Sequence, residues 1–195
     1  MQLGLTGNIA TGKSTVYALL MEREDTVGFD ADAVVHALYD TAEVQEELMA
    51  RLGPQILQAD GTVCRGQIRE AFLRDQTVRP FLEDVFHPRV HTQYSQLLGA
   101  LPADKVLVAD IPLLYEKETP YEFDAVVTVA CSADLQLSRL MSRSALDKAT
   151  ALKMIKKQVA LSYKILQADH VIWNNGGVDQ LRNQLDLLVH HIFFE

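Results

Sequence analysis

The N-terminal residues join a short apolar segment to a glycine-rich turn and then to a helical pattern. Leu3–Thr6 precede a Gly-x-x-x-x-Gly-Lys-Ser sequence at residues 7–14, and Val16, Leu19 and Leu20 follow at helical spacing. This order predicts a strand over residues 3–6, a loop, and a helix from Ser14 to about Glu22. Successive backbone amides in such a loop can turn inward around phosphate oxygens, so the sequence predicts a phosphate-binding loop.

Each part of this loop has a physical task. Gly7 and Gly12 permit backbone angles that a Cβ would hinder, and the following helix adds unpaired N–H groups and the positive end of its dipole. Lys13 can reach the β- and γ-phosphates of a nucleotide, and the Ser14 hydroxyl can bind the bridging magnesium ion. The alternative is a glycine-rich turn that binds nothing. The candidate nucleotide-binding residues are Gly7, Asn8, Ile9, Ala10, Thr11, Gly12, Lys13, Ser14 and Thr15.

Composition limits the class of protein. The 195 residues, 48% hydrophobic and 23% charged, suffice for one core with appended subdomains. The net charge of −8 argues against a sequence-independent nucleic-acid binder. We find no run of 18 apolar residues and no signal-peptide pattern, so we expect a cytosolic protein without a membrane partner. Cys64 and Cys131 lack a paired spacing and are interpreted as reduced thiols. The sequence leaves the oligomeric state open.

Strands alternate with helices along the rest of the chain. Further strands are expected over residues 26–29, 105–109, 124–130 and 170–173, with a closing helix from about Val178. Residues 33–99 are almost wholly helical in pattern, with turn signals at Gly53-Pro54, Asp60-Gly61 and His87-Pro88. The segment is too long for an ordinary crossover, so part of it should form a helical subdomain. The alternation predicts a parallel sheet covered by helices on both faces.

Carboxylates follow two of the predicted strands. Asp30 and Asp32 come after the second strand and Asp110 after the third, at the edge of the sheet where ligands bind. A carboxylate there can hold magnesium or accept a proton from a nucleophile. Either aspartate could instead cap the helix that begins near Ala33. For Asp30 both interpretations stay open, whereas for Asp32 we favour function.

The segment between Cys131 and His170 has the pattern of a movable helical lid. Ser132 can cap a helix whose inward face is apolar, and Arg139 and Arg143 lie four residues apart on another face. Two guanidinium groups so placed could neutralise phosphate charge, although they could equally form a solvated face. A second helix is expected from about Asp147 to Gln158. Candidate basic residues for an anionic substrate are Lys13, Arg65, Arg69, Arg89, Arg139, Arg143 and Lys164.

Taken together, these motifs resemble the dephospho-coenzyme A kinase family over essentially the whole chain. The resemblance rests on the residue 4–15 loop, Asp30-Ala31-Asp32, His87-Pro88, Asp110-Ile111-Pro112-Leu113-Leu114-Tyr115-Glu116, Arg139 to Arg143, Gln158, Lys164, Ala168-Asp169-His170-Val171-Ile172 and Asn174-Asn175-Gly176. It implies a three-layer α/β/α P-loop NTPase fold with a five-stranded parallel sheet. The implied parts are a core (about 1–32, 101–134 and 168–195), a helical coenzyme A subdomain (about 33–100) and a lid (about 135–167).

The resemblance also implies a reaction and roles for residues. ATP, with Mg2+, would phosphorylate the ribose 3′-hydroxyl of the small-molecule substrate dephospho-coenzyme A, the last step of coenzyme A synthesis. Asp32 would be the catalytic base, with Lys13, Arg139 and Arg143 also catalytic and Ser14 and Asp110 near the metal. The implied acceptor-binding residues are Asp32, His87, Pro88, Arg89, Leu113 and Leu114.

Some positions depart from the family pattern. Asn8 stands where a second glycine is common, His36 and Met154 where arginine is common, and Trp173 where aspartate is common. These departures put one acceptor contact and one lid contact in doubt but leave the loop lysine and the expected base intact.

Three other readings stay open. The chain could be a different small-molecule kinase, of the nucleoside monophosphate or shikimate type. It could be a GTP-binding switch, although it lacks an Asn-Lys-x-Asp motif. It could also be a catalytically silent binding module.

Overall fold

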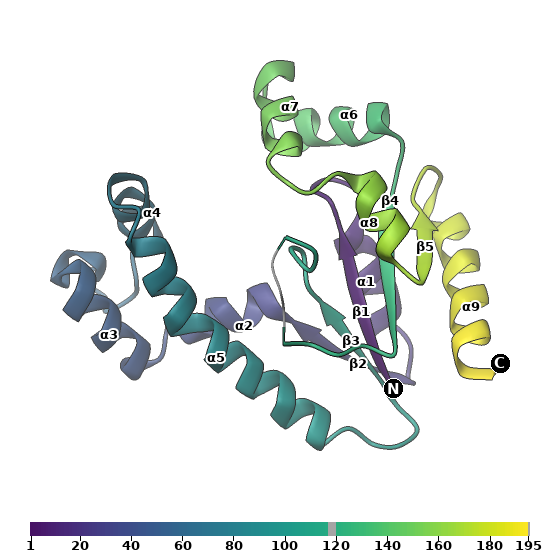
Figure 1. The fold of residues 1–195 in the computed structure, drawn as a ribbon, viewed down its shortest axis with the longest axis horizontal. Helices are drawn as coiled ribbons and strands as arrows, with labels where there is room; N and C mark the ends of the chain where they lie inside the picture. Colours follow the sequence, from purple (N-terminus) through teal and green to yellow (C-terminus); the bar gives the residue numbers. More distant parts are fainter. Residues whose placement is uncertain (117–119, 195) are drawn as a thin grey trace. The chain divides into compact units, whose positions relative to one another are not determined.

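The computed structural model describes residues 1–116 and 120–194, with the side chains of residues 193 and 194 left out (Figure 1). The chain divides into two compact units. The first consists of residues 1–29 and the chain from residue 101, and the second of Asp30–Ala100. The division follows the long helical insertion between the second and third strands.

The first unit contains the sheet. Its strands are β1 (Gln2–Gly7), β2 (Thr26–Asp30), β3 (Val106–Asp110), β4 (Ala125–Ala130) and β5 (His170–Trp173), in the order β2-β3-β1-β4-β5. Its helices are α1 (Lys13–Met21), α6 (Ala133–Ser144), α7 (Lys148–Lys156), α8 (Leu161–Gln167) and α9 (Val178–Phe194). The expected five-stranded parallel sheet with helices on both faces is confirmed.

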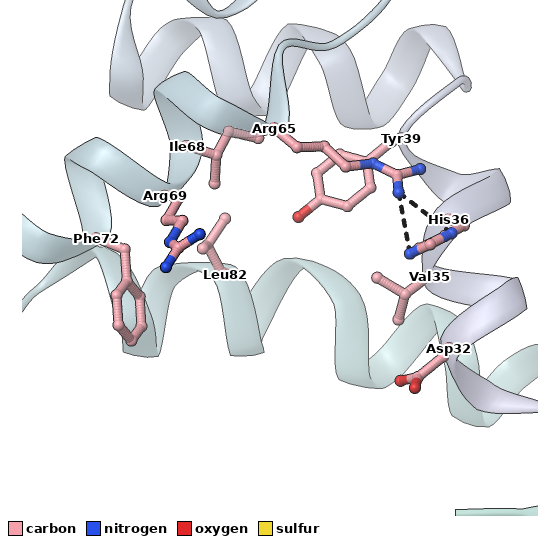
Figure 2. Close-up of a pocket in the computed structure, with 9 residues that line it drawn as sticks. All are labelled: Asp32, Val35, His36, Tyr39, Arg65, Ile68, Arg69, Phe72 and Leu82. Atoms are coloured by element: carbon pink, nitrogen blue, oxygen red, sulfur yellow. Dashed lines mark hydrogen bonds between the residues drawn. The ribbon is translucent and has the colours of Figure 1, made fainter. Parts of the chain in front are cut away.

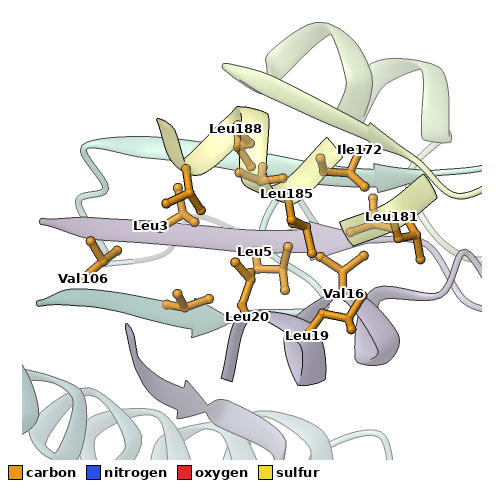
Figure 3. Packing of buried hydrophobic residues seen from close by; sticks show 14 of the residues in the cluster. Leu3, Leu5, Val16, Leu19, Leu20, Val106, Ile172, Leu181, Leu185 and Leu188 are labelled. Atoms are coloured by element: carbon orange, nitrogen blue, oxygen red, sulfur yellow. The ribbon is translucent and has the colours of Figure 1, made fainter. Parts of the chain in front are cut away.

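Alternate residues of the central strands point to opposite faces of the sheet. Leu3 and Leu5 of β1 join the core beneath α1 and α9, where they meet Val16 and Leu185 (Figure 3). On the other face, the Oγ1 of Thr128 donates to the backbone oxygen of Lys164 in α8 at 3.2 Å. Both faces of β1 and β4 are therefore covered, which explains their nearly continuous burial.

The second unit is built almost entirely of helices. It contains α2 (Ala31–Leu38), α3 (Ala42–Leu52), a 3₁₀ turn η1 (Pro54–Ile56), α4 (Arg65–Arg74) and α5 (Val78–Gly99). The expected breaks at Gly53-Pro54 and Asp60-Gly61 are confirmed: α3 ends before Gly53, and Gly61 has a φ of 81°.

The expected break at His87-Pro88 is wrong. Pro88 lies inside the 22-residue helix α5, which runs on as one element (Figure 1). Proline removes one helical hydrogen bond, but Val85 and Phe86 before it and Val90 after it are all buried, so packing on both sides keeps the chain helical. Within the described part of the chain, no helix is long and apolar enough to cross a membrane.

Candidate functional site

The loop between β1 and α1 has the backbone geometry of a phosphate cradle. Ala10 (φ 63°) and Gly12 (φ 94°) adopt left-handed conformations, and Gly12 is the N-cap residue of α1, which therefore has no side-chain cap. A Cβ on Gly7 would lie 2.8 Å from the backbone oxygen of Val129, and one on Gly12 would lie 1.9 Å from Nδ2 of Asn174. Both glycines are therefore required by the local packing, and the first turn of α1 presents its amides toward the loop.

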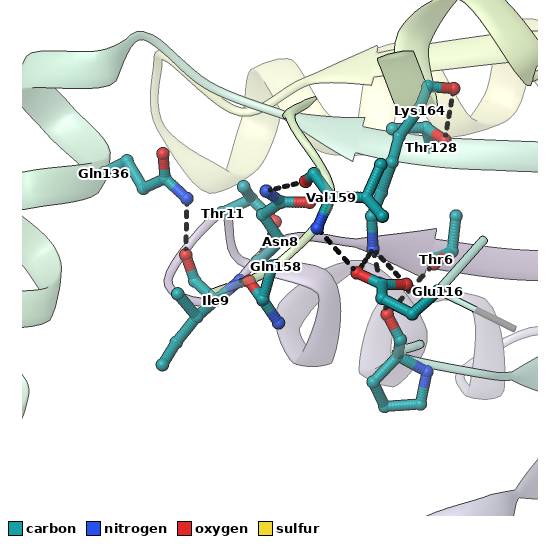
Figure 4. A network of polar contacts seen from close by, with 11 residues as sticks. Thr6, Asn8, Ile9, Thr11, Glu116, Thr128, Gln136, Gln158, Val159 and Lys164 are labelled. Carbon is teal, nitrogen blue, oxygen red and sulfur yellow. Dashed lines mark hydrogen bonds and ion pairs between the residues drawn. The ribbon is translucent and has the colours of Figure 1, made fainter. Parts of the chain in front are cut away.

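Side chains from distant segments hold this loop in place (Figure 4). Asn174, which follows β5, donates from Nδ2 to the backbone oxygen of Thr11 at 2.9 Å. Gln136 of α6 donates to the backbone oxygen of Ile9 at 2.9 Å, and Gln158 accepts from the amide of Ile9 at 2.7 Å. The loop is thus fixed by amide side chains from three parts of the first unit before any ligand is bound.

Sequence reasoning missed much of this support. Gln136 is buried and bonded to the loop, but its position on the expected lid helix gave no signal of that role. Apart from the expected helix end at Gln158, the sequence distinguishes Gln158 and Asn174 only through the family resemblance. One sequence pattern could have indicated the role of Gln136. It is a glutamine on an otherwise apolar inward helix face, beside Leu140.

Lys13 and Asp110 form an ion pair at the carboxyl end of the sheet. Lys13 Nζ donates to Oδ1 of Asp110, and the two side chains are only 13% and 7% exposed. Asp110 is the last residue of β3 and lies opposite Leu5 in the register of β1, so strand pairing brings it to the loop. The loop lysine therefore has a fixed, partly desolvated partner close to where phosphate would sit.

The available oxygens fit a magnesium ion that keeps most of its water. Ser14 offers an exposed hydroxyl in the first turn of α1, and Asp110 offers a carboxylate. The described residues contain no group of three or more His, Cys, Asp or Glu side chains that could hold a metal. Magnesium usually binds through one or two protein oxygens together with substrate phosphates and water, so this sparse donor set is compatible with it.

The two arginines of α6 have different surroundings. Arg139 donates from Nη1 to the backbone oxygen of Asn174 at 3.0 Å, which ties it to the residue that holds the loop. Arg143 is exposed near the end of the helix. Burial raises the pKa of the nearby Cys131 thiol, and the positive charge of Arg139 partly opposes that shift. Ser132 is the N-cap residue of α6 but makes no side-chain capping bond.

The two aspartates after β2 have separate positions. Asp30 accepts a hydrogen bond from the amide of Ala33 at 2.9 Å, so the capping interpretation is confirmed for Asp30. Asp32 lies exposed in the first turn of α2 and lines a cavity of about 320 Å³ in the second unit. Because Asp30 supplies the side-chain cap of α2, Asp32 is not needed for capping.

This cavity combines basic, acidic and apolar groups (Figure 2). The guanidinium of Arg65 contacts the ring of His36 at 3.0 Å and lies 5.5 Å from the ring centroid of Tyr39. The other lining residues are Asp32, Val35, Ile68, Arg69, Phe72 and Leu82. Two arginines and the aromatic side chains of Tyr39 and Phe72 suit a ligand that carries both anionic and planar groups.

The other expected acceptor residues lie outside this cavity. His87 and Pro88 are exposed on α5, while Arg89 pairs with Glu43 and Glu47 of α3. In the first unit, Leu113 is 53% exposed and Leu114 is buried. Expected as a basic residue near an anionic substrate, Lys164 is instead fully buried in α8 and pairs with Glu116 at 2.8 Å.

Comparisons with known proteins give a consistent result. A family model described as dephospho-CoA kinase matches residues 1–180. A dephospho-CoA kinase of Fusobacterium nucleatum is 33% identical over 186 residues, 95% of each chain, and one of Cereibacter sphaeroides is 37% identical over 191 residues, 98% of this chain and 95% of the relative.

Solved structures agree with the fold. A crystal structure from Thermus thermophilus has a TM-score of 0.81 at 29% identity, covering 98% of this chain and 97% of its own. Shikimate kinase from Acinetobacter baumannii, at 15% identity and a TM-score of 0.56, covers 100% of this chain and 95% of its own and shares the fold only. With the family model covering nearly the whole chain and relatives matched end to end, the chain belongs to the dephospho-CoA kinase family.

Proposed function

We propose that this chain transfers the γ-phosphoryl group of ATP to the ribose 3′-hydroxyl of dephospho-coenzyme A, giving coenzyme A and ADP. The observation that carries the proposal is the hydrogen-bonded loop of residues 7–14, with Lys13 paired to Asp110, in a chain of this family. In the reaction, a bond forms between the 3′-oxygen and the γ-phosphorus. The bond from the γ-phosphorus to the β–γ bridging oxygen breaks, and its electron pair leaves with ADP.

The donor side consists of the loop amides and the basic groups around them. Phosphoryl transfer depends mainly on positioning and charge stabilisation, and inward-facing amides with Lys13 supply both. Arg139 and Arg143 are proposed to stabilise charge on the transferred group from the lid, residues 135–167. Magnesium, held through Ser14 and Asp110, would neutralise phosphate charge.

The acceptor side is proposed to lie in the helical segment of residues 33–100. Asp32 is proposed as the base that takes the proton of the 3′-hydroxyl. Two observations support this role for Asp32. It lies two residues after the carboxyl end of β2, in a sheet where the phosphate loop follows the carboxyl end of β1, and it lines the cavity. Arg65 and Arg69 give this wall a positive charge that suits the phosphates of the acceptor. His87, Pro88, Arg89, Leu113 and Leu114 remain proposed acceptor contacts.

A different small-molecule kinase is the second candidate, because the fold is shared with a shikimate kinase. An ADP-coupled assay with ATP and magnesium separates the two. Dephospho-coenzyme A, AMP, adenosine and shikimate are each supplied as acceptors, and we expect the highest kcat/KM for dephospho-coenzyme A. A higher value for any other acceptor would overturn the proposal. If none of the four acceptors is phosphorylated, the chain would instead be a catalytically silent nucleotide-binding module.

Asp32→Asn tests the proposed base. It should reduce kcat by about 10²-fold or more while leaving ATP affinity nearly unchanged, the range expected for the loss of a positioned general base. Asp30→Asn is the matched control, since an asparagine can still cap α2. A near-normal kcat for Asp32→Asn would show that another group takes the proton.

A further inference from the structure

Lys164 is a completely buried lysine that the proposed reaction does not use. Its side chain is 0% exposed, and its Nζ lies 2.8 Å from Oε1 of Glu116, 3.1 Å from Oε2 and 3.2 Å from the backbone oxygen of Pro112. A buried ammonium is expensive unless it is paired and hydrogen-bonded. These contacts satisfy the ammonium and hold it in one geometry.

The pair is anchored to the central strands of the sheet (Figure 4). The Pro112 oxygen that binds Lys164 also accepts from Oγ1 of Thr6 in β1 at 3.3 Å. The backbone oxygen of Lys164 accepts from Oγ1 of Thr128 in β4 at 3.2 Å. Thr6 and Thr128 are paired in the β1–β4 register, so the ion pair is tied to two neighbouring strands at the centre of the sheet.

From these strands, contacts reach the phosphate loop through the segment between α7 and α8. Glu116 accepts from the amide of Val159 at 3.3 Å, and the oxygen of Val159 accepts from Nδ2 of Asn8 at 2.9 Å. The neighbouring residue, Gln158, accepts from the amide of Ile9 at 2.7 Å. Val159 therefore bonds the ion pair through its N–H and the loop through its oxygen.

We propose that Lys164 and Glu116 are positioning residues for the nucleotide site, acting on Asn8 and Ile9 through Gln158 and Val159. A buried ion pair is a weak source of net stability compared with apolar packing, and in some proteins its role is to specify conformation, which is the role proposed for this pair. Here the ion pair is proposed to fix the backbone of residues 158–159, whose contacts in turn orient the Ile9 amide and the Asn8 side chain. The proposal rests on the proposed function only in taking this loop as the ATP site.

Two variants disturb the chain of contacts at different points. Glu116→Gln neutralises one partner of the pair but keeps an oxygen for Val159, and Gln158→Leu removes the acceptor of the Ile9 amide directly. Gln158 is only partly buried, so its replacement should be tolerated by the fold. Arg182→Met is the control, because it removes an exposed ion pair with Glu22, 2.7 Å long, in the same unit.

The measurement is the Kd for ATP with magnesium, determined by calorimetry without any acceptor. Each variant should raise this Kd by about 10-fold, the scale of one lost hydrogen bond to a charged or buried group. The KM for the acceptor at saturating ATP should stay within about twofold. A 15N–1H spectrum should show the Ile9 amide shifted in both variants and unmoved in Arg182→Met.

A double-mutant cycle decides whether Glu116 acts on the loop partly through Gln158, beside the separate contact between Val159 and Asn8. In a Gln158→Leu background, Glu116→Gln should change the Kd clearly less than it does in the parent protein. Full additivity, or an ATP Kd within twofold of the parent in the folded single variants, would overturn the proposal. Because no acceptor is present, a failure of the proposed acceptor specificity would leave this result intact, so the two failures are distinguishable.

Discussion

A methyl group added at Gly12 tests the packing of the phosphate loop most sharply. Gly12 has a φ of 94°, and a Cβ built on it would lie 1.9 Å from Nδ2 of Asn174. That nitrogen is itself bonded to the oxygen of Thr11, and Asn174 is 5% exposed. Gly12→Ala must therefore strain the backbone and also expel the side chain that closes the loop.

The expected cost follows from these two effects. A left-handed alanine costs about 1–2 kcal/mol, from which about 0.4–1 kcal/mol is recovered because alanine restricts the unfolded chain. Breaking a buried hydrogen bond and stranding its oxygen adds about 1–3 kcal/mol. The sum is about 1–4.5 kcal/mol, or a Tm lower by about 2–18 °C for a chain of this size.

Differential scanning calorimetry and ATP titration measure the effect. Gly61→Ala is the matched control, because Gly61 has a φ of 81° but no atom within 4 Å of its built Cβ. It should lose only about 1 kcal/mol and keep its ATP affinity. If Gly12→Ala were no more destabilised than Gly61→Ala and bound ATP normally, the close approach of Asn174 to the loop would be refuted.

Three further results are expected. Lys13→Ala should weaken ATP binding in calorimetry and lower kcat, each by about 10-fold or more, because a phosphate contact is lost; normal values would refute that contact. Hydrogen bonds from Thr77 hold the pKa of Asp75 at about 2, below its usual 3.8, so this carboxylate stabilises the fold above about pH 4 and the contribution disappears as the pH falls toward 2. Thr77→Val should therefore lower the Tm clearly more at pH 6 than at pH 2, where the folded carboxylate is already about half protonated, and an equal loss at both would contradict the linkage. Burial raises the pKa of Cys131, so a thiol reagent at pH 7.5 should modify it at least about 10-fold more slowly than Cys64, and equal rates would contradict its burial.

The strands and the loop could be predicted because their signals are local. The expected strand at 170–173 is confirmed as His170–Trp173, and the other four agree to within one residue at each end. Buried parallel strands have nearly continuous apolar sequences, and glycine spacing defines the loop. Lys13 was likewise recognisable from its place in the motif.

Contacts between distant residues could not be predicted. Lys13 and Asp110 are 97 positions apart, and only the pairing of β1 with β3 brings them together. Lys164 resembles any surface lysine in sequence, because its burial depends on Glu116. Local propensity at Pro88 favours a helix break, whereas packing along α5 overrides it.

Product identification tests the central claim most directly. The protein is incubated with ATP, magnesium and dephospho-coenzyme A, and the product is analysed by mass spectrometry and 31P NMR. We predict one added phosphoryl group per acceptor, located on the ribose 3′-oxygen, with ADP formed in equal amount. ADP formation without acceptor phosphorylation, or a phosphoryl group on any other oxygen, would contradict the account.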